Sequence, residues 1–416
     1  MPQSHDPDRS TTGASPQPDS TRLLDGLRVL DLTRVLAGPY CTMILADLGA
    51  DVVKVERPDD GDESRAFGPF LASGTSAYFS GLNRGKSSIA LDLKQPGDRD
   101  TFLSLVRNAD VLVENFRPGV MDAMNIDVER LRAINPSLIF ASASGFGQTG
   151  PYRDHPAYDV IIQAMSGLMS VTGHDSAAPA RVGTSVGDIV TGLFTAIGIL
   201  AALQRRERTG SGARLDMAML DCTVAVLENA VTRCGITGQN PEPLGTRHPS
   251  ITPFQSFSTS DGAVVIAAGN ERLWKELCHV LELPELLDDL RLSDNTARTE
   301  NQAYLERVIS ARTRERTTED WLLRLRQAGI PAGPIQTIAE VMQDEQLLSR
   351  DMFHRMRGDS GESFLTSGTP FRIDGTVPAL SDRAPQLDQQ AAEIMNRWLP
   401  PPSPPSGNND SGRSDP

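Results

Sequence analysis

Short apolar runs alternate with helix-like segments over the first part of the chain. Six segments are apolar or β-branched, as strands are: residues 27–32, 52–56, 88–91, 111–114, 138–143 and 215–218. Helical spacing of apolar positions occurs between them, at residues 39–48, 98–108, 128–134 and 159–168. This alternation predicts an α/β fold with a large doubly wound, Rossmann-like parallel sheet.

The pattern changes near residue 235, where a segment without periodicity begins. Beyond it, residues 254–257 and 263–268 flank Ser260-Asp261-Gly262 and predict a β-hairpin. Three helices are expected after the hairpin, at residues 271–281, 301–311 and 319–328. The segment Gly329–Pro334 is expected to break the chain. These elements predict a smaller α+β domain.

Five segments of the chain follow from these patterns. They are a tail at 1–22, a large domain at 23–234, a linker with the small domain at 235–345, a return to the large domain at 346–399, and a tail at 400–416. Both tails are rich in Pro, Ser and Asp and are expected to be disordered. The return segment ends in an amphipathic helix, residues 387–399, which is expected to pack on the large domain.

Asp188 lies between a loop and the apolar run Ile189–Leu203, and its position has two interpretations. It can be the N-cap of a buried helix, since Asp is common there. It can also be a nucleophile that attacks an acyl carbon and forms a mixed anhydride, with Gly183 and Gly187 leaving room for a ligand. The local pattern alone leaves both interpretations open.

Composition and charge narrow the range of partners. A net charge of -14 argues against nucleic acid or an anionic membrane surface as a partner. The four cysteines lack the spacing of a zinc site or a disulfide framework, so no metal is expected and a cytoplasmic location is favoured. The apolar run Ile189–Leu203 is too short for a membrane span, which needs about 20 residues.

Ligand-binding candidates lie after the predicted strands. The turn Thr33–Pro39 lacks the GxGxxG pattern of dinucleotide sites, so Glu56 is a weak ribose-binding candidate. Arg57 is either a phosphate ligand at a strand end or a solvated charge. The loop Ser144–Tyr152 is expected to border the site.

Several motifs together resemble the class III CoA-transferase family, over about residues 23–395. They are LRVLDLTRVLAGP at 27–39, LADLGADVVKVERP at 45–58, NRGKSSIALDLK at 83–94, ADVLVENFRPG at 109–119, GFGQTGP at 145–151, VGDIVTG at 186–192 and LGTRHPSITPFQSF at 244–257. The branch that acts on succinyl-CoA and glutarate is the most similar. The family implies a CoA thioester as co-substrate, no permanently bound cofactor, a carboxylic acid as second substrate, and an interlocked homodimer.

The resemblance also implies roles for individual residues. Asp188 matches the family's nucleophilic aspartate. The CoA site is implied at Arg57, Leu91, Asp92, Leu93, Lys94, Asn115, Phe116, Arg117, Tyr158 and Asp159. Arg57, Lys94 and Arg117 would pair with the nucleotide phosphates. Substrate contacts are expected from Arg34, Leu36, Ala37 and His248.

Two departures from the family pattern bear on the reaction. The formate and oxalate branch has Gln where this chain has Leu36, and a Gly-rich loop where it has Gly245–Pro253, so oxalate is not expected. The related acyl-CoA racemases use a histidine where this chain has Tyr158, and His155 is the only local substitute. A racemase or epimerase is the alternative, and would exchange solvent deuterium into the acyl chain.

Dicarboxylic substrates are expected, with succinyl-CoA as donor. A buried second carboxylate needs a cationic partner. Arg34, Arg181 and His248 are the candidates. Arg34 is preferred because a guanidinium binds a carboxylate bidentately and because the carboxyl end of the first strand is expected to face the crevice where the strand order reverses. The other interpretation of Arg34 is an ion pair with a neighbouring acid.

Overall fold

The computed structural model describes residues 20–174 and 176–399. Apart from residues 20–22, the predicted tails lie outside the described residues. Two compact units make up the described chain: a large unit of residues 20–157, 188–222 and 351–399, and a small unit of residues 158–187 and 223–350. Residues 158–187 and 223–234, expected in the large domain, thus group with the small unit.

A six-stranded sheet of parallel strands forms the centre of the large unit. Its order is β3-β2-β1-β4-β5-β6, which reverses direction between β1 and β4. The strands are β1 (Arg28–Asp31), β2 (Asp51–Glu56), β3 (Ser87–Ala90), β4 (Val111–Glu114), β5 (Ile139–Ser144) and β6 (Ala213–Ala218). The predicted parallel sheet is confirmed, and ligands bind such sheets where the strand order reverses.

Alternate residues of each central strand enter two different cores. Leu30, Val53 and Leu112 face one core, whereas their neighbours in sequence, Val29 and Val52, face the other. This follows from the two-residue period of a strand, since both faces are covered by helices. Both cores are therefore continuous hydrophobic layers.

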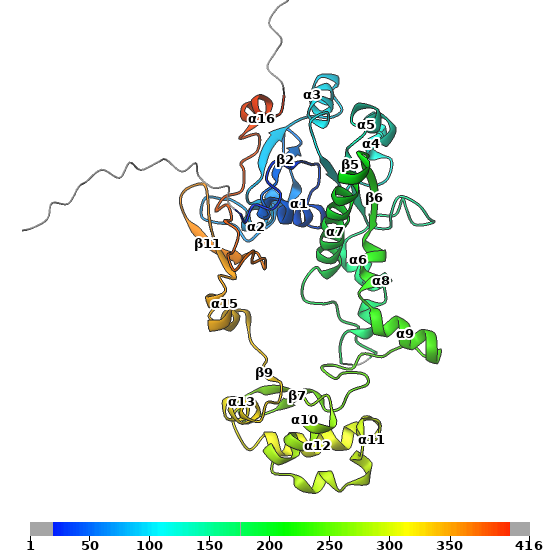
Figure 1. The fold of residues 1–416 in the computed structure, drawn as a ribbon, viewed down its shortest axis with the longest axis vertical. Helices are drawn as coiled ribbons and strands as arrows, with labels where there is room; N and C mark the ends of the chain where they lie inside the picture. Colours follow the sequence, from blue (N-terminus) through cyan, green and yellow to red (C-terminus); the bar gives the residue numbers. More distant parts are fainter. Residues whose placement is uncertain (1–19, 175, 400–416) are drawn as a thin grey trace, which may run out of the picture. The chain divides into compact units, whose positions relative to one another are not determined.

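Helices cover both faces of this sheet (Figure 1). The helices α3 (Pro96–Val106), α4 (Val120–Ala123), α5 (Val128–Ile134) and α16 (Ala391–Trp398) pack in one core, and α1 (Ala37–Asp47) and α7 (Val186–Thr209) pack in the other. Two further helices, α2 (Ala77–Asn83) and α8 (Met219–Ala225), contribute to neither core, and α8 extends past Cys222, where the large unit's segment ends. The predicted C-terminal helix is confirmed as α16, because Ile394 and Trp398 lie in the core of the large unit.

The chain before α16 covers the edge strand β3. The backbone N–H of Ser88 donates to Gln390 Oε1, and that of Ala90 donates to Asp388 Oδ1. The Trp398 indole donates to Asp51 Oδ2 at 2.7 Å. An edge strand that would otherwise expose unpaired backbone groups is thus closed by side chains.

Helix α7 begins earlier than the sequence pattern indicates. It starts at Val186, so Asp188 lies in its first turn and is not its N-cap. The helix is 24 residues long, and an 18-residue stretch of it has a mean hydropathy of 2.0, enough by length and composition to cross a membrane. Ala196, Ile199 and Ala202 nevertheless pack in the core of the large unit. Helix α7 is therefore a partly buried core helix of a soluble fold.

The small unit has its own sheet and core. Strands β7 (Phe254–Ser258) and β8 (Ala263–Ala267) form the predicted hairpin, and β9 (Ala332–Pro334) pairs antiparallel with β8. The expectation that 329–334 only breaks the chain is wrong, because a short edge strand tolerates prolines. The helices are α6 (Asp159–Met165), α9 (Glu228–Thr237), α10 (Glu271–Val280), α11 (Asn295–Glu300), α12 (Gln302–Thr313), α13 (Thr318–Gln327), α14 (Ile338–Val341) and α15 (Glu345–Ser349).

A hairpin of β10 (Phe353–Arg357) and β11 (Ser363–Ser367) precedes α16 in the large unit. The sequence pattern did not indicate this hairpin.

Candidate functional site

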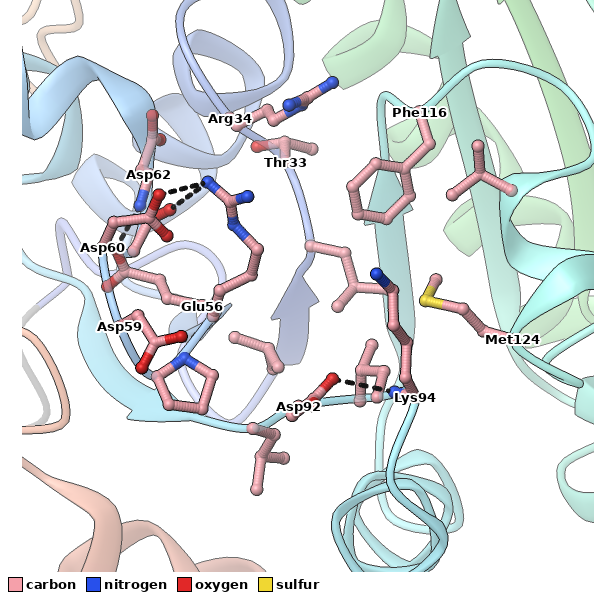
Figure 2. A pocket seen from close by; sticks show the side chains of 18 of the residues that line it. Thr33, Arg34, Glu56, Asp59, Asp60, Asp62, Asp92, Lys94, Phe116 and Met124 are labelled. Atoms are coloured by element: carbon pink, nitrogen blue, oxygen red, sulfur yellow. Dashed lines mark hydrogen bonds and ion pairs between the residues drawn. The ribbon is translucent and has the colours of Figure 1, made fainter.

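A cavity of about 710 Å³ lies in the large unit at the carboxyl ends of the central strands. Its lining comes from the segments that follow β1, β2, β3 and β4: Leu32, Thr33, Arg34, Val55–Asp62, Leu91–Lys94, Phe116, Arg117, Val120 and Met124. Figure 2 shows this cavity, with the Lys94 side chain extended beside Phe116 and Met124. The size suits a ligand as large as a nucleotide.

Most of the predicted CoA-binding residues lie together in this lining. They are Arg57, Leu91, Asp92, Leu93, Lys94, Phe116 and Arg117. Arg57 donates to Asp60 at 3.0 Å, and both side chains are exposed. Within the described residues, Lys94 and Arg117 form no ion pair. The cavity therefore combines an apolar wall with cations that can bind phosphate.

Asn115, also predicted to bind CoA, is not in the lining. Its amide oxygen accepts from the backbone N–H of Arg34 at 2.9 Å, and its amide nitrogen donates to the Arg34 carbonyl at 2.8 Å. Asn115 thus holds the turn between β1 and α1. The sequence alone does not show that the Asn115 amide bonds to this backbone rather than to a ligand.

Arg34 lies at the cavity with its guanidinium already engaged. Its Nη1 is 2.5 Å from Glu63 Oε1, and the guanidinium carbon is 5.9 Å from the Phe116 ring centre. Both ends of the ion pair are more than 40% exposed, so the pair contributes little to stability. Of the two interpretations of Arg34, the ion pair is the one present here, and a substrate carboxylate would have to compete with Glu63.

The next residue in this turn, Val35, has an unfavourable backbone conformation. Its φ is 68°, a left-handed value that a β-branched residue rarely adopts. The Asp62 carboxylate accepts from the Val35 N–H at 3.1 Å and from the backbone and hydroxyl of Ser64. The turn is therefore held in place by a group from the loop after β2.

A buried lysine lies beneath both segments. Lys54 Nζ is 2.9 Å from Asp62 Oδ2 and donates to the Thr33 carbonyl at 2.7 Å, and neither charged side chain is more than 1% exposed. Burial disfavours the charged lysine, but the nearby carboxylates of Asp31 and Asp62 raise its pKa. The pKa of Asp62 is lowered in spite of burial, because Lys54 is close. Lys54 and Asp62 therefore stay charged, and Lys54 links the turn after β1 to the loop after β2 that lines the cavity.

Glu56 is fully engaged inside the protein. Its carboxylate accepts from Arg65, from the Ser88 hydroxyl at 2.7 Å and from the backbone N–H of Asp62. These bonds leave it in no position to hold a ribose. The absence of GxGxxG from the turn Thr33–Pro39 and the bonds of Glu56 together argue against a dinucleotide site.

Glu114, at the end of β4, was not singled out in the sequence. It is 4% exposed, accepts from the Phe116 N–H at 2.8 Å and is hydrogen-bonded to Ser142. Burial raises the pKa of Glu114 to about 7. A carboxyl that is about half protonated near pH 7 thus contacts the backbone of Phe116, which lines the cavity.

The N-terminus of α7 lies against the N-terminus of α1 within the large unit. A Cβ on Gly192 would lie 2.7 Å from the Ala37 carbonyl oxygen, so only glycine allows this approach. Asp188 is four residues earlier and therefore shares the face of α7 that Gly192 turns toward α1. Leu36 and Ala37, the predicted substrate residues, form the start of α1. The positive ends of two helices favour a carboxylate there.

Three other predicted residues belong to the small unit and do not line the cavity. Tyr158 is 74% exposed before α6. Asp159 is buried, and its carboxylate accepts from the Gly187 N–H at 2.9 Å. A Cβ on Gly187 would lie 3.0 Å from that carboxylate, so this glycine makes room for Asp159. His248 lies against Phe254, with ring centres 5.3 Å apart.

Comparisons with known proteins identify a family and several similar chains. The family model described as CoA-transferase family III matches residues 24–391. The chain is 45% identical to acetyl-CoA:oxalate CoA-transferase of Acetobacter aceti, over 91% of this chain and 96% of the relative. It is 43% identical to succinyl-CoA:mesaconate CoA-transferase of Haloarcula hispanica, over 90% and 96%. A CAIB/BAIF family protein from Brucella suis, solved by crystallography, has a TM-score of 0.79 at 41% identity, covering 90% of this chain and 98% of its own.

Proposed function

This chain belongs to CoA-transferase family III, and from that premise we propose that Asp188 is the nucleophile of an enzyme that exchanges CoA between dicarboxylic acids. The enzyme moves CoA from an acyl-CoA to a carboxylate. The observation that carries the proposal is the place of Asp188 in the first turn of α7, on the face that meets the start of α1. The nearby cavity supplies cations for the phosphates of CoA.

The proposed reaction proceeds through intermediates on Asp188. Its carboxylate attacks the thioester carbonyl of the donor, the C–S bond breaks, and CoA leaves as thiolate. The thiolate then attacks the aspartyl carbonyl of the mixed anhydride and releases the donor acid, which leaves an aspartyl-CoA thioester. The acceptor carboxylate attacks this thioester, the C–S bond breaks, and a second mixed anhydride forms as CoA leaves again as thiolate. The thiolate finally attacks the acceptor carbonyl of that anhydride, which gives the acceptor's CoA thioester and releases the Asp188 carboxylate. Each step exchanges carboxylate and thiolate, so the thioester energy is retained.

The helix ends suit this chemistry. Every attack places negative charge on a carbonyl oxygen, and backbone N–H groups at a helix start are preorganised donors for such an oxygen. We assign this role to the backbone at Leu36 and Ala37, whose turn is held by Asn115 and Asp62.

Two similar proteins are named for dicarboxylic acceptors, oxalate and mesaconate, which supports a dicarboxylate class for this chain. The similarity to the oxalate enzyme returns oxalate to the acceptors that need testing, although Leu36 was expected to disfavour it. Succinyl-CoA is the proposed donor. Mesaconate, glutarate and hydroxylated short diacids complete the acceptor panel, with mass spectrometry of the CoA products as readout.

The proposed enzyme is a homodimer located in the cytoplasm. Helix α7 exposes an apolar stripe of Leu193, Ile197 and Leu200, of which Ile197 is 58% exposed. Ile236 on α9 is 81% exposed. Apolar faces of this kind favour burial against a second copy. Sedimentation at several concentrations tests the dimer.

Covalent labelling tests the nucleophile. Wild-type enzyme mixed with the donor should gain the mass of an acyl or CoA adduct on the peptide that contains Asp188. The Asp188→Asn variant should fold and bind CoA but lose turnover. If it keeps more than about a tenth of wild-type activity, equivalent to only about 1.4 kcal/mol, the assignment is wrong.

A further inference from the structure

A buried amide in α6 holds the segment that leads into Asp188. Gln163 is 0% exposed, and both ends of its side-chain amide are used. Its oxygen accepts from the backbone N–H of Val182 at 2.9 Å. Its nitrogen donates to Asp159 Oδ2 at 2.7 Å and to the Thr184 carbonyl at 3.3 Å. One side chain thus contacts two points of the segment 181–187.

Asp159 extends the same contact to the last residue before Asp188. Its Oδ1 accepts from the Gly187 N–H, while its Oδ2 accepts from Gln163 and lies 3.6 Å from Arg181 Nη2. The bond from Gln163 therefore fixes the rotation of the Asp159 carboxylate. That rotation in turn determines where the Gly187 N–H lies, one peptide bond from Asp188.

We propose that Gln163 is a positioning residue for the nucleophile: with Asp159 it anchors residues 182, 184 and 187, so that α7 begins with Asp188 in the orientation for attack. This inference rests on the proposed function. Gln163 touches no reacting atom. Loss of the Gln163 hydrogen bonds should slow the chemical step, because a displacement of about 1 Å at a reacting group can lower its rate about a hundredfold.

The bland interpretation is that Gln163 only stabilises the fold, as any buried amide does. The chain offers a matched control. Asn135 is also buried, its amide nitrogen donates to the carbonyls of Val106 and Ala109, and its oxygen accepts from Ser137. It holds a loop at the opposite, amino-terminal end of the strands. An apolar near-isostere at each position removes a comparable set of bonds.

The test is the rate at which succinyl-CoA acylates Asp188 in a single turnover, followed by intact mass, together with the Kd for free CoA. Gln163→Met should slow acylation by at least about tenfold with CoA affinity within about twofold of wild type, since the CoA cations lie elsewhere. Asn135→Leu should lower the melting temperature at least as much and change acylation less than about twofold.

The proposal is overturned if Gln163→Met acylates at the wild-type rate, or if Asn135→Leu slows acylation equally. Should Gln163→Met not fold, Gly187→Ala tests the same contact, because its Cβ would lie 3.0 Å from Asp159 Oδ1. The same slowing at unchanged CoA affinity supports the proposal, and wild-type acylation refutes it. If the wild-type enzyme forms no adduct on Asp188, the proposed function fails first, and the role of Gln163 falls with it.

Discussion

The buried carboxyl of Glu114 gives a prediction whose sign and size follow from the structure. Its pKa of about 7 exceeds the ordinary value of 4.5 because of burial. The folded protein therefore holds this proton more tightly than the unfolded chain does, so the stabilisation is complete below about pH 4.5 and is lost as pH rises to about 7. A shift of this size corresponds to about 3 kcal/mol.

The Glu114→Gln variant removes the titration but keeps a neutral group of the same shape. Near pH 5 the difference in stability between the variant and the wild type should stay below about 1 kcal/mol, because the folded wild type is neutral and the pH is only slightly above the unfolded pKa. At pH 8 the variant should be more stable by up to about 3 kcal/mol, because the wild type must bury a carboxylate. For a unit of this size, 1 kcal/mol shifts the melting temperature by roughly 2–4 °C.

The assay is thermal unfolding of both proteins between pH 5 and 8, with the difference in melting temperature plotted against pH. Other titrating groups, Asp47 among them, are common to both proteins and cancel in the difference. A difference that is constant across this range would show that Glu114 ionises normally. A difference that falls with pH would reverse the sign of the argument.

Three further expectations concern the cavity and its rim. Substitution of Arg57, Lys94 or Arg117 by Ala should raise the KM for CoA esters by about tenfold or more and change the KM for the acceptor acid much less. Equal effects on both KM values would show that these cations do not form the phosphate site. Arg34→Met should lower the rate of CoA transfer from succinyl-CoA much more than the rate from butyryl-CoA. Glu63→Gln only frees the Arg34 guanidinium and should not lower the rate with succinyl-CoA. Equal slowing of both donors by Arg34→Met would exclude Arg34 as the diacid ligand. Lys54→Met should lower the free energy of unfolding by roughly 3–5 kcal/mol, because Asp62 is left buried without its partner. In chemical denaturation the double variant Lys54→Met/Asp62→Leu should recover most of this loss. A double variant whose loss equals the sum of the two single losses would contradict the pairing.

The parallel sheet could be predicted because its strands have strong local signals. Strands that are covered on both faces read as continuous apolar runs, and Val111–Glu114 is recovered at its observed bounds. Strand β9 could not be predicted in this way, since Ala332, Gly333 and Pro334 have low strand propensity and pair only because β8 lies beside them. Tertiary context overrides the local pattern there.

The candidate site likewise has residues whose position the sequence predicts and residues whose contacts it does not. Cations directly after strands, such as Arg57, are visible in the sequence because strand ends converge at one edge of the sheet. The bonds of Asn115 and Asp159 are not visible, because polar groups of the same types can face a ligand or the backbone of another segment. The start of α7 was also misplaced, since Val186 and Gly187 carry no helix signal of their own.

Closure of β3 by the C-terminal segment has a consequence for synthesis. Gln390, which bonds to Ser88, is 302 residues further along the chain. At about 5–20 residues per second, the ribosome completes this stretch in roughly 15–60 s. Throughout that interval the nascent chain presents an open strand edge, to which another nascent copy can add a strand. The enzyme should therefore depend on a holdase chaperone during translation, and messages that end before codon 388 should yield aggregates even though every proposed catalytic residue has been made.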